Sequence, residues 1–229
     1  MEDQLLGTTL PVLSISLDPG ESVVAEVGEF SWMTDSIQMS TQISAQISAQ
    51  NKIAGSSLPL STFTAQGAAG TIAFASKLPG SILPVDIGPG NQYTVHRRGF
   101  LAGTTGIQLS PGFQQSFATG IFAGEGFLLQ RIGGRGRAWV ELAGEVIRFE
   151  LSPGRSLRVH PGHVGMFESS VAFQVVPVPG ITNRYFGGNA HHFAVLSGPG
   201  TVWLQSIPLS MLAASLVPYL GTPSPQSRN

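Results

Sequence analysis

Apolar and polar residues alternate in short runs along most of the chain. In residues 22–26, Val23 and Ala25 alternate with Val24 and Glu26. Residues 93–96 and 157–160 repeat this pattern. A period of two places one set of side chains in a core and the other set outward, as in a β-strand. The pattern therefore predicts short strands, and we expect Val24 and Glu26 to face outward.

Three of these runs share a motif in which one strand leads through a Pro-Gly pair into the alternating strand. The pairs are Pro19-Gly20, Pro89-Gly90 and Pro153-Gly154, which lie 70 and 64 residues apart (89 − 19 and 153 − 89). Proline fixes φ at the first central position of a type II turn, and glycine supplies the positive φ at the next. The motif predicts a tight hairpin at each of the three places.

A second motif recurs in phase with the first. It begins at Phe63, Phe127 and Phe193, which lie 64 and 66 residues apart, and it contains closely spaced glycines. Two motifs in phase predict three related blocks, 14–80, 81–148 and 149–206, after a lead-in of residues 1–13. Because one such block is marginal alone, we expect the three to share a core. The predicted fold class is all-β, a single β-sandwich or double-stranded β-helix-like domain of three internal repeats.

Three stretches fall outside this pattern. Residues 207–218 predict a short helix, because Pro208 and Pro218 bound a segment that carries one apolar stripe. The stripe consists of Leu209, Leu212, Ala213 and Leu216. Residues 219–229 predict a flexible tail. The polar residues 38–60 predict a loop or a weakly held strand.

Composition narrows the class of protein. Hydrophobic residues make up 42% of the chain. Charged residues make up 11%, whereas roughly 25% of the residues in a soluble domain are usually charged. The 29 Gly and 16 Pro indicate many turns and exclude a coiled coil or helical bundle. The absence of Cys excludes disulfides and thiolate chemistry. The acidic start, Met1-Glu2-Asp3, lacks the basic region of a secretory signal, which favours a cytoplasmic location.

The sequence also resembles a known family. Residues 196–206, Leu-Ser-Gly-Pro-Gly-Thr-Val-Trp-Leu-Gln-Ser, resemble the closing signature of the family named for altered inheritance of mitochondria. Residues 17–26, Met33 and the Leu-Pro-Gly of 78–80 resemble its opening features. The resemblance covers about residues 12–218. This chain departs from the pattern at residues 43–50, which are polar rather than Gly-rich, and at 133–136, which read Gly-Gly-Arg-Gly in place of Gly-Pro-Gly.

This resemblance implies a β-sandwich with three structural repeats, similar to the fold of the tryptophan RNA-binding attenuation protein. The family has no established catalytic residues, and its bacterial members long carried an unknown-function label. Its mitochondrial members are tied to inner-membrane organisation. The basic, acid-poor transit peptide of such proteins is not found in this sequence.

Equivalent positions of the three blocks carry one candidate metal site. Glu26, His96 and His160 occupy the same position after each Pro-Gly turn. Two His and one carboxylate form a known ligand set for divalent metals, so a metal-dependent enzyme is one alternative function. The set requires the three blocks to circle an axis on which these residues meet. Otherwise they lie apart on a solvated sheet face.

Arginines offer the first alternative to a scaffold, a binder of nucleic acid or of a small phosphorylated ligand, ahead of the metal-dependent enzyme. The candidate residues are Arg131, Arg135, Arg137, Arg155 and Arg158. The competing interpretation of 131–137 is a hairpin turn, because the other blocks have Gly-rich turns there. Residues 1–90 carry 8 acids and 2 bases, whereas residues 91–229 carry 5 acids and 10 bases. This asymmetry favours steering between subunits over nucleic-acid binding.

The most apolar stretch contains Phe113, Phe117 and Phe122, which are candidates for an interaction surface. Core packing is the other interpretation of this stretch. No nucleophile elbow, phosphate loop or zinc-protease motif occurs in the sequence. We therefore predict a non-catalytic, homo-oligomeric scaffold or interaction protein without a cofactor, with a protein or a membrane surface as further partner.

Overall fold

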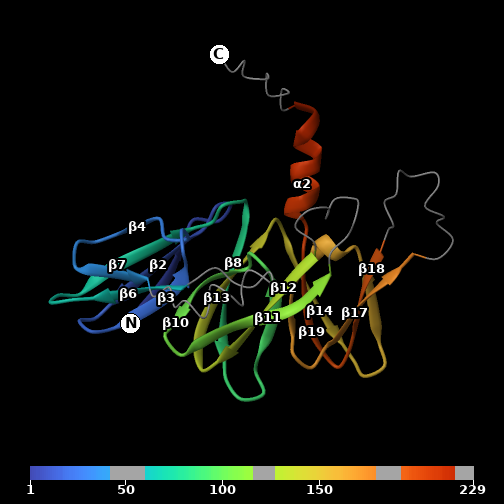
Figure 1. The fold of residues 1–229 in the computed structure, drawn as a ribbon, viewed down its shortest axis with the longest axis horizontal. Helices are drawn as coiled ribbons and strands as arrows, with labels where there is room; N and C mark the ends of the chain where they lie inside the picture. The colour runs from blue at the N-terminus through green and yellow to red at the C-terminus, as the bar shows by residue number, and fades with distance from the viewer. Residues whose placement is uncertain (42–59, 116–126, 179–191, 220–229) are drawn as a thin grey trace, which may run out of the picture.

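The computed structural model describes residues 1–41, 60–115, 127–178 and 192–219. These residues form antiparallel β-sheets and one short helix near the C-terminus, so the predicted all-β fold class is confirmed. The described strands make up four sheets, which we number from first to fourth along the molecule (Figure 1).

The two outer sheets are small. The first sheet contains, in spatial order, β1 (Glu2–Leu6), β2 (Val12–Leu17), β7 (Gly70–Ala75) and β4 (Trp32–Met33). The fourth sheet contains β15 (Ser156–Val159), β18 (His192–Ser197) and β17 (Ala172–Pro177).

The two inner sheets have six strands each. The second sheet contains β5 (Ile37–Thr41), β6 (Leu60–Ala65), β3 (Ser22–Glu26), β10 (Phe100–Thr104), β13 (Gly136–Ala143) and β8 (Gly80–Ile87). The third sheet contains β11 (Ile107–Gln115), β12 (Phe127–Gly134), β9 (Tyr93–His96), β16 (Val164–Glu168), β19 (Gly200–Gln205) and β14 (Val146–Leu151).

An apolar core lies between each two consecutive sheets. The first core joins Ile15 of the first sheet to Phe63 and Trp139 of the second. The second core lies between the second and third sheets, and the third core between the third and fourth. Both inner sheets are therefore covered on both faces, which the alternating pattern does not predict. Val24 and Glu26, predicted to face outward, are buried because their face of β3 packs against the third sheet.

The same strand pairing occurs three times along the chain. In β2–β7, β8–β13 and β14–β19, the first strand pairs with the sixth, the second with the fifth, the third with the sixth and the fourth with the fifth. Successive units are joined by the pairs β3·β10 and β9·β16. This regularity supports the prediction of three related blocks, and the block boundaries stay a prediction.

The Pro-Gly turns have the predicted conformation. Each closes with a hydrogen bond from the fourth residue to the first, as from the Glu21 amide to the Asp18 carbonyl at 2.9 Å. The glycine φ values are +90° at Gly20, +79° at Gly90 and +76° at Gly154. The turns are not hairpins, however, because the strands that they connect belong to consecutive sheets. Each turn carries the chain from one layer to the next.

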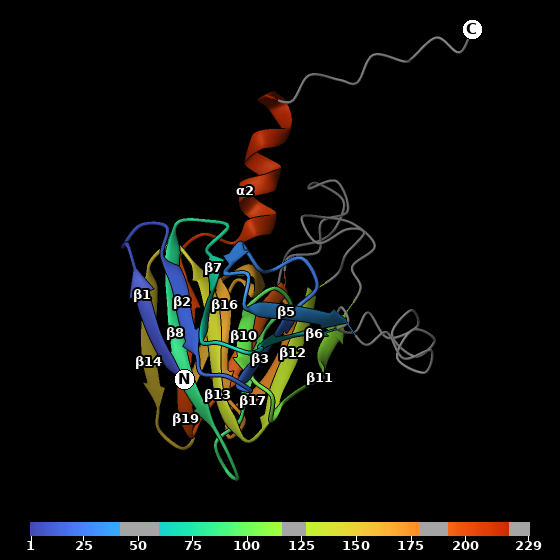
Figure 2. The ribbon, with the colours of Figure 1, turned by 90° about the vertical axis from the view of Figure 1, so that its left-hand side faces the viewer.

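The predicted helix corresponds to α2 (Leu209–Leu216), followed by the short η2 (Val217–Tyr219). It projects from the body of the molecule (Figure 2). Its base is fixed by Pro208, which packs against Gly162 in η1 (Pro161–His163). Leu209 and Leu216 of the predicted apolar stripe are exposed. Within the described ranges, no helix combines the length and apolarity needed to cross a membrane.

Substitution of Trp139 tests the first core. The side chain is fully buried, and its indole Nε1 donates to Asp3 Oδ2 at 3.2 Å. We expect Trp139→Leu to lower the free energy of unfolding by about 3 kcal/mol, because it leaves a cavity and removes the hydrogen bond. Urea denaturation measures the change. Tyr219→Leu, at a highly exposed position, is the control and should change stability by less than about 0.5 kcal/mol. Equal effects of the two substitutions would contradict the assignment of Trp139 to the core.

Candidate functional site

Glu26 lies in the second core rather than on a solvated face. Its Oε1 accepts a hydrogen bond from Gln130 Nε2 of the third sheet at 2.9 Å. Burial raises the pKa of the Glu26 carboxyl, and the bond from Gln130 opposes this shift. Gln130 Oε1 is buried without a hydrogen-bond partner among the described atoms. This contact is a polar link between two sheets.

His96 ends β9, at the turn that leads into the second sheet. Its Nε2 lies 3.3 Å from the backbone oxygen of Glu141. Burial lowers the pKa of His96 to about 4, so the ring is neutral at pH 7 and Nε2–H donates to this carbonyl. The carboxylate of Glu141 accepts from the Lys77 amide, and burial raises the pKa of this carboxyl.

The predicted metal ligands are not assembled. His160 Nδ1 accepts from the Gly162 amide at 3.3 Å and caps η1. Glu26 lies in the second sheet, His96 in the third, and His160 directly after a strand of the fourth. Equivalent residues thus follow the layers of a stack and do not converge on an axis. Over 1–41, 60–115, 127–178 and 192–219, no group of three or more His, Asp or Glu is placed to hold a metal ion.

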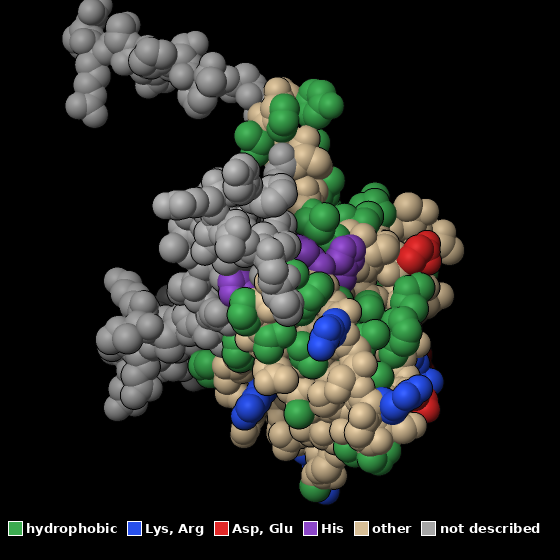
Figure 3. All heavy atoms as spheres, turned by 90° about the vertical axis from the view of Figure 1, so that its right-hand side faces the viewer, with side chains coloured by type: hydrophobic (Ala, Val, Ile, Leu, Met, Phe, Trp, Pro, Cys, Tyr) green, Lys and Arg blue, Asp and Glu red, His purple; other side chains and the backbone are tan. Residues whose placement is uncertain are grey.

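The candidate arginines are also distributed over several sheets. Arg137 is already paired, with Asp86 at 3.0 Å and Asp3 at 3.1 Å, and these hydrogen bonds raise its pKa. Arg131, Arg135, Arg155 and Arg158 are exposed. Figure 3 shows the cations on one face as separate spots among neutral and apolar side chains. The 131–137 segment is a bend at Arg135 between β12 and β13 and not a hairpin, because these two strands belong to different sheets.

The predicted interaction surface is only partly described. Phe117 and Phe122 lie outside the described residues. Phe113 is half-buried, and its ring packs against Phe173 with centroids 4.9 Å apart. A bulge between Pro111 and Gln114 interrupts the pairing of β11 with β12, next to Phe113.

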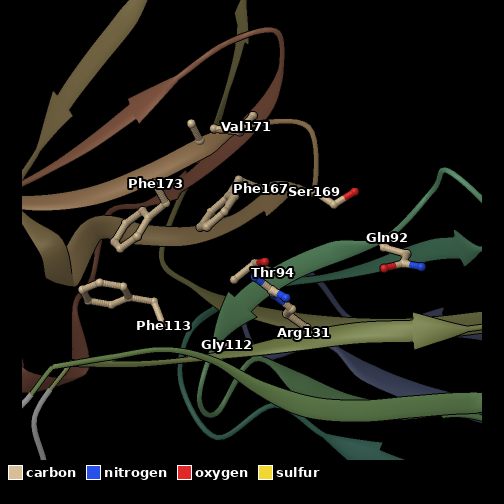
Figure 4. Close-up of a pocket in the computed structure, with 10 residues that line it drawn as sticks. Gln92, Thr94, Gly112, Phe113, Arg131, Phe167, Ser169, Val171 and Phe173 are labelled. Carbon is tan, nitrogen blue, oxygen red and sulfur yellow. The ribbon is translucent and has the colours of Figure 1, made fainter.

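Phe113 lines a pocket of about 450 Å³ between the third sheet and β17 (Figure 4). The polar residues around it are Gln92, Thr94, Arg131 and Ser169. The remaining lining residues are Gly112, Phe113, Phe167, Val171, Ala172 and Phe173. Of this set, the sequence pattern points only to Arg131 and Phe113, each for a different role. Residues from β9, β11, β12, β16 and β17 meet here, which no local pattern predicts.

Two sheet edges form a second candidate site. In the described part of the chain, β4 pairs with β7 alone and β15 with β18 alone. Their counterparts in the inner sheets are paired on both sides, because β10 pairs with β3 and β16 with β9. Each outer sheet therefore resembles one half of an inner six-stranded sheet.

Side chains near these edges are exposed where their counterparts are buried. Trp32 in β4 is 55% exposed, whereas Ala102 and Met166, at the same position in the next two units, are fully buried. Phe149 in β14 is 37% exposed, and its counterpart Ile15 is fully buried. In the described residues, no half-sheet packs over Trp32 and Phe149 as one packs over their buried counterparts.

Comparison with known proteins identifies the family. The family model described as Mitochondrial biogenesis AIM24 matches residues 4–207, nearly the whole chain. The chain belongs to the AIM24 family. An uncharacterised protein of Streptococcus pyogenes serotype M6 is 23% identical to this AIM24 chain over 224 residues, which cover 93% of the chain and 88% of that protein.

A crystal structure of a Streptococcus pyogenes protein shares the fold. The TM-score is 0.77 at 20% sequence identity, and the match covers 96% of this AIM24 chain and 99% of that protein. The family membership inferred from residues 196–206 is confirmed. The likeness to the tryptophan RNA-binding attenuation protein stays a prediction.

The buried His96 predicts a pH dependence of stability. Because its pKa is lowered from 6.5 to about 4 in the folded chain, its contribution is complete above pH 6.5 and is lost as the pH falls toward 4. The loss amounts to at most about 3 kcal/mol. His96→Gln removes the titration and keeps a donor for the Glu141 carbonyl. Denaturation from pH 7.5 to 4.5 should show wild type losing stability relative to this variant, and a constant difference would contradict the assignment.

Proposed function

We propose that this AIM24 chain is a non-catalytic scaffold that self-associates head to tail by completing its two outer half-sheets. The observation that carries this proposal is the pair of edge strands, β4 at one end of the stack and β15 at the other, each of which has a single pairing partner among the described strands. Joined across two copies, the fourth and first sheets would reproduce the strand order of the inner sheets. Main-chain pairing at sheet edges is a common mode of association.

The inner sheets supply the register for this contact. Val24 and Thr94 each lie four residues after a turn glycine, and they pair with Gly103 and Phe167. The corresponding residue of β15 is Arg158. The residue of β4 that corresponds to Gly103 and Phe167 is Met33, because it pairs with the same position of its neighbouring strand. The proposed contact therefore places Arg158 opposite Met33 of the second copy.

Burial and charge both support this arrangement. In the inner layers, the residues equivalent to Trp32 and Phe149 are covered by half of a neighbouring sheet. In the proposed assembly, a second copy would supply that half-sheet. Association would bury these two exposed side chains and so gain a hydrophobic contribution. Residues 12–75 carry five acids and one base, whereas residues 146–205 carry two acids and four bases. The acidic first unit and the basic third unit would attract each other.

A head-to-tail contact joins two different surfaces of the same chain. Such contacts form a ring when the rotation between copies closes and a filament when it does not. Support for a structural rather than a catalytic role comes from Glu26, His96 and His160, which are engaged in contacts between or within layers. The cytoplasmic location inferred from the sequence stays a prediction.

Substitution of Trp32 tests the assembly. We expect wild type to sediment at a multiple of 24.0 kDa in analytical ultracentrifugation. Trp32→Ser should weaken association about tenfold, because a buried aromatic anchor is lost. Tyr219→Ser, which changes another exposed aromatic residue, is the control and should assemble like wild type. A strictly monomeric wild type at micromolar concentration, or full assembly of the Trp32 variant, would refute the proposal.

A charge exchange tests the register. In the proposed contact, Arg158 lies opposite β4 of the second copy, and Asp35 follows the end of that strand. Arg158→Glu and Asp35→Arg should each weaken association about fivefold, and the double variant should regain most of the loss. Arg135→Glu, in the bend between β12 and β13 and outside both edge strands, controls for net charge. Additive losses in the double variant would contradict the register. The assembly itself would still be tested by the Trp32 variant.

A further inference from the structure

The pocket beside Arg131 occupies a place that is filled one layer earlier in the fold. Thr94 is flanked in the third sheet by its pairing partners Arg131 and Phe167. The corresponding row of the second sheet is Thr62, Val24 and Gly103. Because strand order and register agree between the two sheets, the two rows can be compared position by position.

The row in the second sheet is closed by apolar packing. Val24 is buried in the second core together with Ile107 of the facing strand. Gly103 leaves the space that these side chains need, since a Cβ there would lie 2.9 Å from Ile107 Cγ1 and 3.3 Å from Phe100. The equivalent place in this fold can therefore be filled by the chain itself.

The row in the third sheet lines an open pocket instead. Valine is replaced by Thr94, threonine by Arg131 and glycine by Phe167, and about 450 Å³ remains between this row and β17. The hollow is consequently a property of these side chains and is not required by the topology. Its volume lies within the range of small-molecule sites.

The two ends of the pocket differ in chemistry. At one end, the rings of Phe113 and Phe167 both pack against Phe173, with centroid distances of 4.9 and 5.4 Å. At the other end lie Arg131, Thr94, Gln92 and Ser169 (Figure 4). Arg131 forms no ion pair with any residue that the structure describes. An aromatic wall and a guanidinium that has no ion-pair partner among the described residues fit a ligand with an apolar body and an anionic head.

We propose that this pocket binds a small amphipathic carboxylate, with its aryl or alkyl body against the three phenylalanines and its carboxylate on Arg131. The planar guanidinium binds a carboxylate through two parallel hydrogen bonds. Thr94 and Ser169 supply hydroxyl groups beside it. The proposal is independent of self-association, because none of these residues belongs to β4 or β15.

Calorimetric titration with 4-phenylbutyrate and octanoate, and with the neutral 4-phenylbutan-1-ol and octan-1-ol, tests the proposal on the full chain. We expect at least one carboxylate to bind wild type and its alcohol to bind at least about tenfold more weakly. Arg131→Gln should weaken carboxylate binding about tenfold and leave the alcohol unchanged. Arg155→Gln, at another exposed arginine, should bind like wild type.

A second variant tests the pocket itself. Thr94→Val introduces the residue found in the filled layer, and it should weaken carboxylate binding several-fold without lowering the melting temperature. Absence of binding by both carboxylates, equal affinity for acid and alcohol, or unchanged binding by the Arg131 variant would each overturn the proposal. Equal losses in the Arg131 and Arg155 variants would also overturn it, because they would indicate that any exposed arginine contributes equally through non-specific attraction of the anion.

Discussion

Strand pairing between successive units is the interaction on which the rest of this structure depends. Through β3·β10 and β9·β16, half of one six-strand unit and half of the next become one continuous sheet. Each inner sheet then has a core on both faces. Without this pairing, a unit would expose both a sheet edge and an apolar sheet face. The units therefore depend on one another to bury their apolar side chains.

The same constraint explains the polar residues inside the stack. A strand with two buried faces has no solvated side, so the buried carboxyl of Glu26 accepts its hydrogen bond from Gln130 of the next layer. His96 is likewise held neutral against the Glu141 carbonyl. The same constraint explains why the ends of the stack differ from its middle. Among the described strands, β4 and β15 pair on one side only, and Trp32 and Phe149 remain exposed. The layers provide similar positions in which side chains either fill the space, as around Val24, or leave a pocket, as around Thr94.

Local patterns predicted the parts of the fold that depend on neighbouring residues. Alternation identified strands such as β3, β9 and β15, Pro-Gly pairs identified the type II turns, and prolines bounded the helix. The closing signature at 196–206 identified the family. The candidate site was predicted poorly: Arg131 and Phe113 were singled out, but as parts of a phosphate site and an interaction surface. Thr94, Phe167 and Phe173 carried no signal, because an alternating strand has the same pattern whether its second face meets water, a core or a cavity.

The amino-acid sequence alone determined the strands, their turns and the threefold recurrence of one motif, because backbone geometry and side-chain alternation act over a few residues. Only the tertiary structure decided which layer each strand joins. The Pro-Gly turn has the same local geometry in a hairpin and in a crossing between sheets, and the choice depends on strands far away in the chain. That choice separates Glu26, His96 and His160 into successive layers, and it brings Arg131, Thr94 and Phe173 around one pocket.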